Sequence, residues 1–218
     1  MVKLKAAILI SGRGSNMRAL VAACNEPGFP AEVVLVISNN PDSSGLEYAK
    51  EAGLTSHVID QKGFPKRAEF DAVLDSVLCD HKVELVCLAG FMRILSEELV
   101  NKWRDRIINV HPSLLPSFKG LNTHTRVLQS GVSFSGCTIH FVRPEMDDGP
   151  VIVQAAVPVH SGDTVENLDA RVLAAEHRAY PLALRLIAEG RVRVVEEAVK
   201  IDGAIAPADA MLNPIEES

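Results

Sequence analysis

Short apolar runs that alternate with amphipathic segments constrain the fold of this chain more than any other feature. The runs in its first half are bounded by polar residues or glycine and fall at residues 5–11, 32–38, 57–60, 83–89 and 107–110. Runs of this length are typical of strands that are buried on both faces of a sheet. Helical patterns separate them, so we expect an α/β fold: a doubly wound, mostly parallel sheet with helices on both faces.

The second half of the chain is expected to add antiparallel strands toward the C-terminus. Residues 138–142 and 151–157 are β-rich, and the short loop between them ends in Gly-Pro. This pattern is typical of a hairpin-like pair. A long helix is predicted over 163–189. No linker divides the chain, so we predict one domain over residues 1–195 and a loosely packed C-terminal tail over 196–218.

Composition narrows the classes of protein to which the chain can belong. It has 218 residues, of which 47% are hydrophobic, and this suits the core of one α/β domain. The formal net charge of −6 argues against a broad contact with a phosphate backbone, so no nucleic-acid partner is expected. The four cysteines form no Cys-x-x-Cys pair, and the first apolar run ends at Ser11, too early for a signal peptide. No apolar stretch approaches the roughly 20 residues that span a bilayer, so we expect a cytoplasmic protein without a membrane partner.

Two polar side chains stand at the end of the fifth predicted strand, in the stretch Asn-Val-His-Pro-Ser-Leu-Leu-Pro at residues 109–116. Asn109 and His111 are two residues apart, and residues at this spacing on a strand point to the same face. Pro112 then ends the strand pairing because it has no N–H to donate. Ligands of open α/β sheets bind at the carboxyl ends of the strands, so the pair is a candidate site. An isolated Asn-x-His pair is more often a buried histidine and a turn asparagine that only support the fold.

A glycine-rich turn, Ser-Gly-Arg-Gly-Ser-Asn at residues 11–16, follows the first predicted strand and leads into a helical pattern. This order of elements directs backbone N–H groups at an anion. The dinucleotide fingerprint lacks its third glycine here, since position 17 is Met, and no Gly-Lys-Ser/Thr follows. We therefore predict that the turn binds a single terminal phosphate, while a plain glycine turn remains the alternative.

Charged residues mark two further segments. Lys66 and Arg67 stand in the first turn of a helix predicted over 66–80, where acidic residues are preferred. A nearby anion would explain these cations, and a solvated charged pair explains them equally well. The loop that ends in Gly-Pro carries Asp147 and Asp148. Taken alone, Asp147 is as readily a loop acid that caps its own backbone.

Five motifs occur in order along the chain. They are Gly-Arg-Gly-Ser-Asn at 12–16, Gly-Phe-Met-Arg-Ile-Leu at 90–95, Asn-Val-His-Pro-Ser-Leu-Leu-Pro at 109–116, Gly-Leu-Asn-Thr-His at 120–124 and Met-Asp-Asp-Gly-Pro at 146–150. Together they closely resemble the phosphoribosylglycinamide formyltransferase family, and the resemblance covers about residues 5–195. It implies transfer of the formyl group of 10-formyltetrahydrofolate, a co-substrate, to the glycinamide amine of 5′-phosphoribosylglycinamide in purine biosynthesis.

The resemblance also implies roles for individual residues. The catalytic trio would be Asn109, His111 and Asp147. The ribonucleotide would contact Gly14, Ser15, Asn16, Arg67 and Glu176, and the folate would contact Arg93, Ile94, Leu95, Arg143, Met146 and Asp147. The chain departs from the family at Asn122, where a histidine is common, and this leaves His124 as the only imidazole in that motif. The expected partners are small-molecule substrates, the assembly is expected to be a monomer or homodimer, and no zinc-type ligand spacing is present.

The implied chemistry requires these residue types. A neutral amine attacks the formyl carbon, and negative charge develops on the formyl oxygen. An amide donor such as Asn109 and a protonated His111 can stabilise that charge. A carboxylate beside the histidine favours the imidazolium and fixes the orientation of the ring. A proton leaves the amine and reaches N10 of the folate through water, so no serine or cysteine nucleophile is needed.

Three alternatives share part of this pattern. A formyltetrahydrofolate deformylase, in which water replaces the amine, usually has an additional N-terminal domain, whereas the first strand is expected here at residue 5. A methionyl-tRNA formyltransferase normally has a further C-terminal domain and a basic surface for tRNA. A non-catalytic nucleotide-binding module would need the phosphate turn but not the trio. The five motifs together favour the glycinamide formyltransferase over each of these alternatives.

Overall fold

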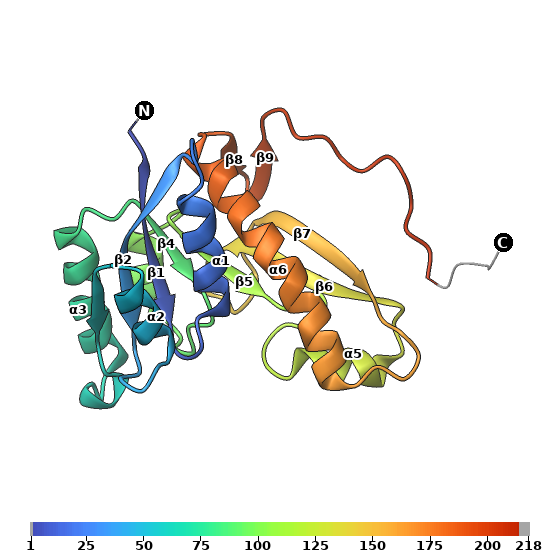
Figure 1. Ribbon diagram of the computed structural model, residues 1–218, viewed down its shortest axis with the longest axis horizontal. Helices are drawn as coiled ribbons and strands as arrows, with labels where there is room; N and C mark the ends of the chain where they lie inside the picture. The colour runs from blue at the N-terminus through green and yellow to red at the C-terminus, as the bar shows by residue number, and fades with distance from the viewer. Residues whose placement is uncertain (1, 214–218) are drawn as a thin grey trace.

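The computed structural model describes residues 2–213 and contains a seven-stranded sheet (Figure 1). Its strands lie in the order β3-β2-β1-β4-β5-β6-β7. Their bounds are β1 (Leu4–Ile10), β2 (Ala31–Ser38), β3 (Ser56–Val58), β4 (Leu85–Leu88), β5 (Ile107–His111), β6 (Phe134–Phe141) and β7 (Val151–Pro158). The first five strands pair in parallel, and β6 and β7 pair antiparallel. The predicted doubly wound, mostly parallel sheet is therefore confirmed.

Two groups of helices cover the two faces of the sheet. The helices are α1 (Ser15–Cys24), α2 (Gly45–Glu51), the 3₁₀ turn η1 (Gln61–Gly63), α3 (Arg67–Asp80), α4 (Glu97–Lys102), α5 (Thr123–Ser130) and α6 (Val165–Ala188). Side chains of α1 and α6 pack with strand residues such as Ile8 and Ile108, and both helices lie in front of the sheet in Figure 1. Side chains of α3 and α4 pack with the alternate strand residues, such as Leu9 and Ile107. Since successive side chains of a strand point to opposite faces, the two clusters lie on opposite sides of the sheet.

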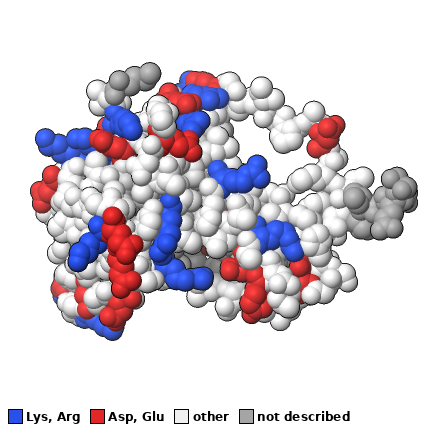
Figure 2. Space-filling view, viewed as in Figure 1, with Lys and Arg blue, Asp and Glu red and all other residues white. Residues whose placement is uncertain are grey.

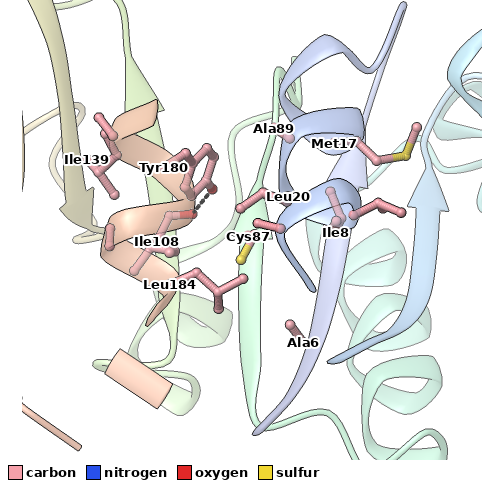
Figure 3. Close-up of a cluster of buried hydrophobic side chains, with 14 of the residues drawn as sticks. Ala6, Ile8, Met17, Leu20, Cys87, Ala89, Ile108, Ile139, Tyr180 and Leu184 are labelled. Atoms are coloured by element: carbon pink, nitrogen blue, oxygen red, sulfur yellow. Dashed lines mark hydrogen bonds between the residues drawn. The ribbon is translucent and has the colours of Figure 1, made fainter. Parts of the chain in front are cut away.

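Tyr180 of α6 points into the core between the sheet and the helices α1 and α6, where it lies beside Leu20, Ile108 and Leu184 (Figure 3). The side chain is fully buried. Its hydroxyl lies 3.1 Å from the carbonyl oxygen of Leu88 and 3.2 Å from that of Ile108. A single hydroxyl therefore joins α6 to β4 and β5, the two strands that lead to the candidate site.

The strand order reverses between β1 and β4, and this is the place in open α/β sheets where the loops diverge and ligands bind. Ser11, directly after β1, joins the two loops that diverge here. Its backbone N–H donates to the carbonyl oxygen of Gly90 at 3.1 Å, and its hydroxyl accepts from the N–H of Met92 at 2.7 Å. The sheet therefore holds the turn at 11–16 and the loop at 90–95 side by side.

A second, two-stranded sheet follows α6 and consists of β8 (Val192–Val195) and β9 (Ala198–Ile201). The tail predicted from residue 196 thus begins inside a hairpin. The turn is formed by Glu196 and Glu197, both in left-handed conformation with φ of 50° and 60°. Two-residue turns of this kind usually contain Asn-Gly or Asp-Gly, so Glu-Glu gave no turn signal in the sequence. From residue 204 to residue 212 the chain is exposed and lies outside any strand or helix.

The surface is of mixed charge. On the face shown in Figure 2, Lys and Arg side chains are interspersed with Asp and Glu, and no extensive basic area is visible on that face. Among residues 2–213, no helix combines the length and hydropathy that a bilayer span requires.

Replacement of Tyr180 by Phe tests the tie between α6 and the strands. Tyr180→Phe keeps the ring but leaves two buried carbonyl groups without this donor, so the free energy of unfolding in urea should fall by about 1–3 kcal/mol. Tyr48→Phe is the matched control, because Tyr48 is only partly buried and packs its ring against Arg18. Equal stability of the two variants would show that the Tyr180 hydroxyl contributes nothing to folding.

Candidate active site

His111, the last residue of β5, has hydrogen-bond acceptors beside both ring nitrogens. Nδ1 lies 3.3 Å from a carboxylate oxygen of Asp147, and Nε2 lies 2.9 Å from the carbonyl oxygen of Phe118. The side chain is buried. Each nitrogen of a doubly protonated imidazole is a donor, so this environment satisfies the imidazolium on both sides. The strand thus presents a histidine that is suited to stabilise negative charge.

Asp147 reaches His111 by an indirect route. Strand β6 is antiparallel to β5, with Phe141 opposite Ile108 and Thr138 opposite His111, so the loop after β6 leaves the sheet near the beginning of β5. The loop then returns along β5 to bring Asp147 to His111. The backbone of Asp147 is left-handed, with φ of 52°, and its carboxylate accepts from the N–H of Gly120 at 2.8 Å. Backbone and side chain are therefore both constrained at the residue that meets the histidine.

Asp148, by contrast, pairs with a residue other than the histidine. Its carboxylate pairs with Lys119, and its side chain is 54% exposed, compared with 12% for Asp147. Adjacent acids in one loop thus have different surroundings, and only Asp147 is brought to His111.

Asn109 is oriented by His140, a residue that the sequence did not single out as functional. The two residues lie opposite each other in the β5–β6 register, and the Asn109 amide nitrogen is 3.3 Å from Nε2 of His140. Nδ1 of His140 lies 2.9 Å from the carbonyl oxygen of Phe141 and so acts as the donor there, which leaves Nε2 to accept from Asn109. Burial lowers the pKa of His140, in keeping with a neutral ring. The sequence could not identify the role of His140, because the alternation along β6 does not show which residue of β5 lies opposite it. The antiparallel register supplies that partner.

The turn after β1 has the geometry of an anion site. Gly14 is the N-cap of α1 and has φ of 70°. A Cβ on Gly14 would lie 3.3 Å from the backbone of Gly45, and side chains rarely adopt this left-handed φ, so the position favours glycine. The first N–H groups of α1, at Ser15 and Asn16, have no carbonyl partner within the helix. They are oriented to bind a phosphate.

Asn16 and Glu176, both predicted to contact the ribonucleotide, are in contact with each other. The Asn16 amide donates to the Glu176 carboxylate at 2.7 Å, and both side chains are buried. Burial raises the pKa of Glu176 to about 7, although the hydrogen bond from Asn16 opposes the rise. The Asn16 side-chain oxygen is buried without a hydrogen-bond partner in the described part of the chain. The side-chain nitrogen of Asn16 is thus engaged by Glu176, and its backbone N–H, at the start of α1, stays available to an anion.

Arg67 and Arg93 lie on the face of α3 and α4, opposite the face that α1 covers. Arg67 is exposed at the first residue of α3, and within residues 2–213 no hydrogen bond or ion pair joins it to the turn at 11–16. One helical turn later, Phe70 stacks beneath the guanidinium of Arg93 at 4.2 Å. Asn109 and His111 point to this same face, because they alternate with Ile108 of the other cluster. The two arginines therefore lie on the face of the sheet toward which the catalytic candidates point.

The remaining folate candidates differ in exposure. Ile94 and Met146 are large apolar side chains with exposed fractions of 54% and 57%, whereas Leu95 is buried in the core under α3 and α4. Arg143 is buried, and its guanidinium donates to Glu197 at 2.6 Å and to Asp105 at 2.7 Å. A third hydrogen bond runs from its guanidinium to the carbonyl oxygen of Val142, so each of its three nitrogens has a partner within the protein, and the folate contact of Arg143 stays a prediction.

Asn122 and His124 stand at the start of α5. Asn122 is left-handed with φ of 54°, a conformation that asparagine adopts more readily than most residues. His124 lies 3.3 Å from the carboxylate of Asp169 on α6, and burial lowers the pKa of its ring. The contact between His124 and Asp169 joins α5 to α6. Among residues 2–213, no group of three His, Cys, Asp or Glu is arranged to hold a metal ion.

Comparisons with known proteins agree with this geometry. A model of the formyl transferase family matches residues 4–184. Phosphoribosylglycinamide formyltransferase of Escherichia coli is 42% identical over 200 residues, which cover 92% of this chain and 94% of that protein. The trifunctional purine biosynthetic protein adenosine-3 of Gallus gallus is 55% identical over 194 residues, and the chain spans only 19% of its length.

Solved structures give the same result. Glycinamide ribonucleotide transformylase 1 from Symbiobacterium toebii has a TM-score of 0.89 and 46% identity, with coverage of 91% of this chain and 94% of that chain. A formyltetrahydrofolate deformylase from Pseudomonas syringae has a TM-score of 0.84 but only 25% identity, and the match covers 66% of it. On the combined evidence of fold, site geometry and sequence similarity, the chain belongs to the formyl transferase family.

Proposed function

We propose that this protein transfers the formyl group of 10-formyltetrahydrofolate to the glycinamide amine of 5′-phosphoribosylglycinamide in purine biosynthesis. The observation that carries the proposal is the meeting of Asn109, His111 and Asp147 at the end of β5. The E. coli relative, which is named for this reaction, matches over nearly its whole length. The partners would be small molecules alone, and the protein would act in the cytoplasm as a monomer or homodimer, without a metal.

The reaction forms one C–N bond and breaks another. The amine attacks the formyl carbon, and the carbonyl electrons move to the formyl oxygen. The Asn109 amide and His111 would donate to that oxygen, which would take the place of the Phe118 carbonyl at His111 Nε2. Asp147 would hold the imidazolium in position. Collapse of the intermediate breaks the bond to N10, and the proton from the amine reaches N10 through water.

The two substrates would approach from opposite faces of the sheet. The N–H groups at Ser15 and Asn16 would hold the ribose phosphate, and Glu176 would contact the remainder of the ribonucleotide. The folate would lie on the face of α3 and α4, against Ile94 and Met146, which are apolar and exposed. The reacting atoms would then meet at the edge of the sheet beside His111.

An assay with 10-formyltetrahydrofolate separates this proposal from its alternatives. We expect 10-formyltetrahydrofolate to lose its formyl group only when glycinamide ribonucleotide is present, with the ribonucleotide formylated on its amine as the product. Release of formate without the ribonucleotide would identify a deformylase. Binding of the ribonucleotide without turnover would identify a non-catalytic module.

Removal of the Asn109 amide should slow the chemical step. Asn109→Ala deletes a donor to the developing oxyanion, and loss of one such donor typically lowers kcat by about 10²–10³-fold. Steady-state kinetics should show this fall with little change in either KM. Asn101→Ala on α4, where the residue is exposed, is the matched control. Near-normal kcat with lower thermal stability would mean that Asn109 only supports the fold.

The two adjacent acids of the loop should respond differently to loss of charge. Asp147→Asn keeps the size of the side chain but removes the charge beside His111, so kcat should fall by about 10²-fold with little change in the KM for the ribonucleotide. Asp148→Asn, which breaks only an exposed pair with Lys119, should leave kcat within about twofold. If Asp148 were the sensitive position, the catalytic acid would be misassigned, and if neither mattered, the trio would be refuted.

The KM values of an Arg67 variant would decide which substrate this residue binds. The residue shares its face with Arg93 and Asn109, so we expect it to bind a carboxylate of the folate rather than the ribose phosphate. Arg67→Ala should raise the KM for the folate by about 10–100-fold, equivalent to the roughly 1.5–3 kcal/mol of a charged hydrogen bond. Lys66→Ala, at the exposed neighbouring position, is the control. A rise in the KM for the ribonucleotide alone would instead support the phosphate contact predicted from the sequence.

A further inference from the structure

Arg143 connects three segments that are far apart in the sequence. It lies near the start of the loop that carries Asp147, and its side chain is only 6% exposed. One acid partner is Asp105, in the turn that precedes β5, and the other is Glu197, in the turn of the β8–β9 hairpin. Glu197 also accepts from Arg104. The guanidinium holds the pKa of Glu197 below its usual range, in keeping with a persistent ion pair.

The two ends of the loop are firmly packed, whereas its middle is open to solvent. Residues 144–146 are exposed, and Arg143, Gly149 and Pro150 are buried. A Cβ on Gly149 would overlap the carbonyl oxygen of Phe141 and would lie 3.3 Å from Cγ of Arg143. The aliphatic part of Arg143 thus packs against the returning end of the loop. Its charged end is fixed by the two acids.

The path of the loop makes the position of Arg143 important for the site. The loop starts beside the first residues of β5, where the N–H of Val142 donates to the carbonyl oxygen of Ile107, and Asp147 has to reach the last residue of that strand. Four residues of a strand span roughly 13 Å. Over such a length, a small rotation of the loop at Arg143 would displace Asp147. Beyond Arg143, Asp147 is held by the N–H of Gly120 and by His111 itself.

We propose that Arg143 is a positioning residue for Asp147, and that Asp105 and Glu197 act with it by holding its guanidinium. The inference rests on the proposed role of Asp147 in formyl transfer. It also makes the β8–β9 hairpin, through Glu197, a part of the structure that aligns the site, although within residues 2–213 no hydrogen bond or ion pair joins the hairpin to the catalytic trio.

Removal of the Glu197 carboxylate should therefore change kcat only through its effect on the position of Asp147. Without it, the buried guanidinium keeps a single acid partner, and the loop samples a wider range of positions. Displacement of a catalytic group by about 1 Å can lower the rate by about 10²-fold, so a partial loss of restraint should lower kcat by about 5–10-fold. The KM for the ribonucleotide should not change, because the glycine turn lies on the other face of the sheet.

A double-mutant cycle between Glu197→Gln and Asp147→Asn tests the proposal, with Glu196→Gln as the matched control. Glu196 is exposed in the same turn and carries the same charge. We expect Glu197→Gln to lower kcat by about 5–10-fold in the otherwise unaltered protein, and by less than about twofold in the Asp147→Asn background. Arg143→Met should behave like Glu197→Gln, and Arg143→Lys should recover part of the loss. Glu196→Gln should leave kcat unchanged.

The possible outcomes distinguish failure of the positioning role of Arg143 from failure of the catalytic role of Asp147. Equal effects of Glu197→Gln in both backgrounds would mean that the ion pairs contribute to general stability, and the positioning role would be refuted. The same conclusion follows if Glu197→Gln and Glu196→Gln are indistinguishable while Asp147→Asn is severely impaired. An Asp147→Asn protein with normal kcat would instead overturn the catalytic role of Asp147 on which the inference rests. The free energy of unfolding in urea, measured for each variant, checks that every variant is folded under the conditions of the kinetic assay.

Discussion

The antiparallel pairing of β6 with β5 is the constraint on which the candidate site depends. It sets His140 opposite Asn109, so that a buried neutral imidazole orients the amide. It also makes the following loop leave the sheet near the beginning of β5 and return along the strand, which brings Asp147 to His111. A parallel strand in the same place would have released its loop directly at the carboxyl edge. The polar groups that meet at this strand end are therefore products of one change in strand direction.

The parts of this arrangement that could be predicted are those with a local cause. Apolar runs gave the parallel strands, because strands that are buried on both faces need no polar alternation. The Asn-x-His spacing gave a shared face, because the strand repeat is two residues. The identification of Asp147 came from family resemblance, and its place beside His111 agrees with it.

The parts that could not be predicted depend on contacts between distant segments. Arg143 belongs to a loop that resembles a folate-binding segment, and nothing near it in the sequence indicates that Asp105 and Glu197 hold it. His140 has no local signal either, because only the register with β5 reveals its partner. The hairpin turn at Glu196 and Glu197 lacks the usual turn residues, and its left-handed backbone is supported by the pairing of the strands on either side. The face on which Arg67 lies became clear only once the core under α3 was known.

The β8–β9 hairpin also determines how short a working unit of this kind can be. The family model matches residues 4–184, and a chain cut at residue 184 would retain the seven strands of the main sheet, the glycine turn and every residue of the catalytic trio. It would nevertheless lose the acid that pairs with Arg143, and a buried cation would be left incompletely neutralised. In a polypeptide that fuses several activities, the hinge to the next unit would therefore have to begin after Gly203, where the hairpin has closed. An ion pair thus sets the limit of the unit, beyond the last residue that the family model matches.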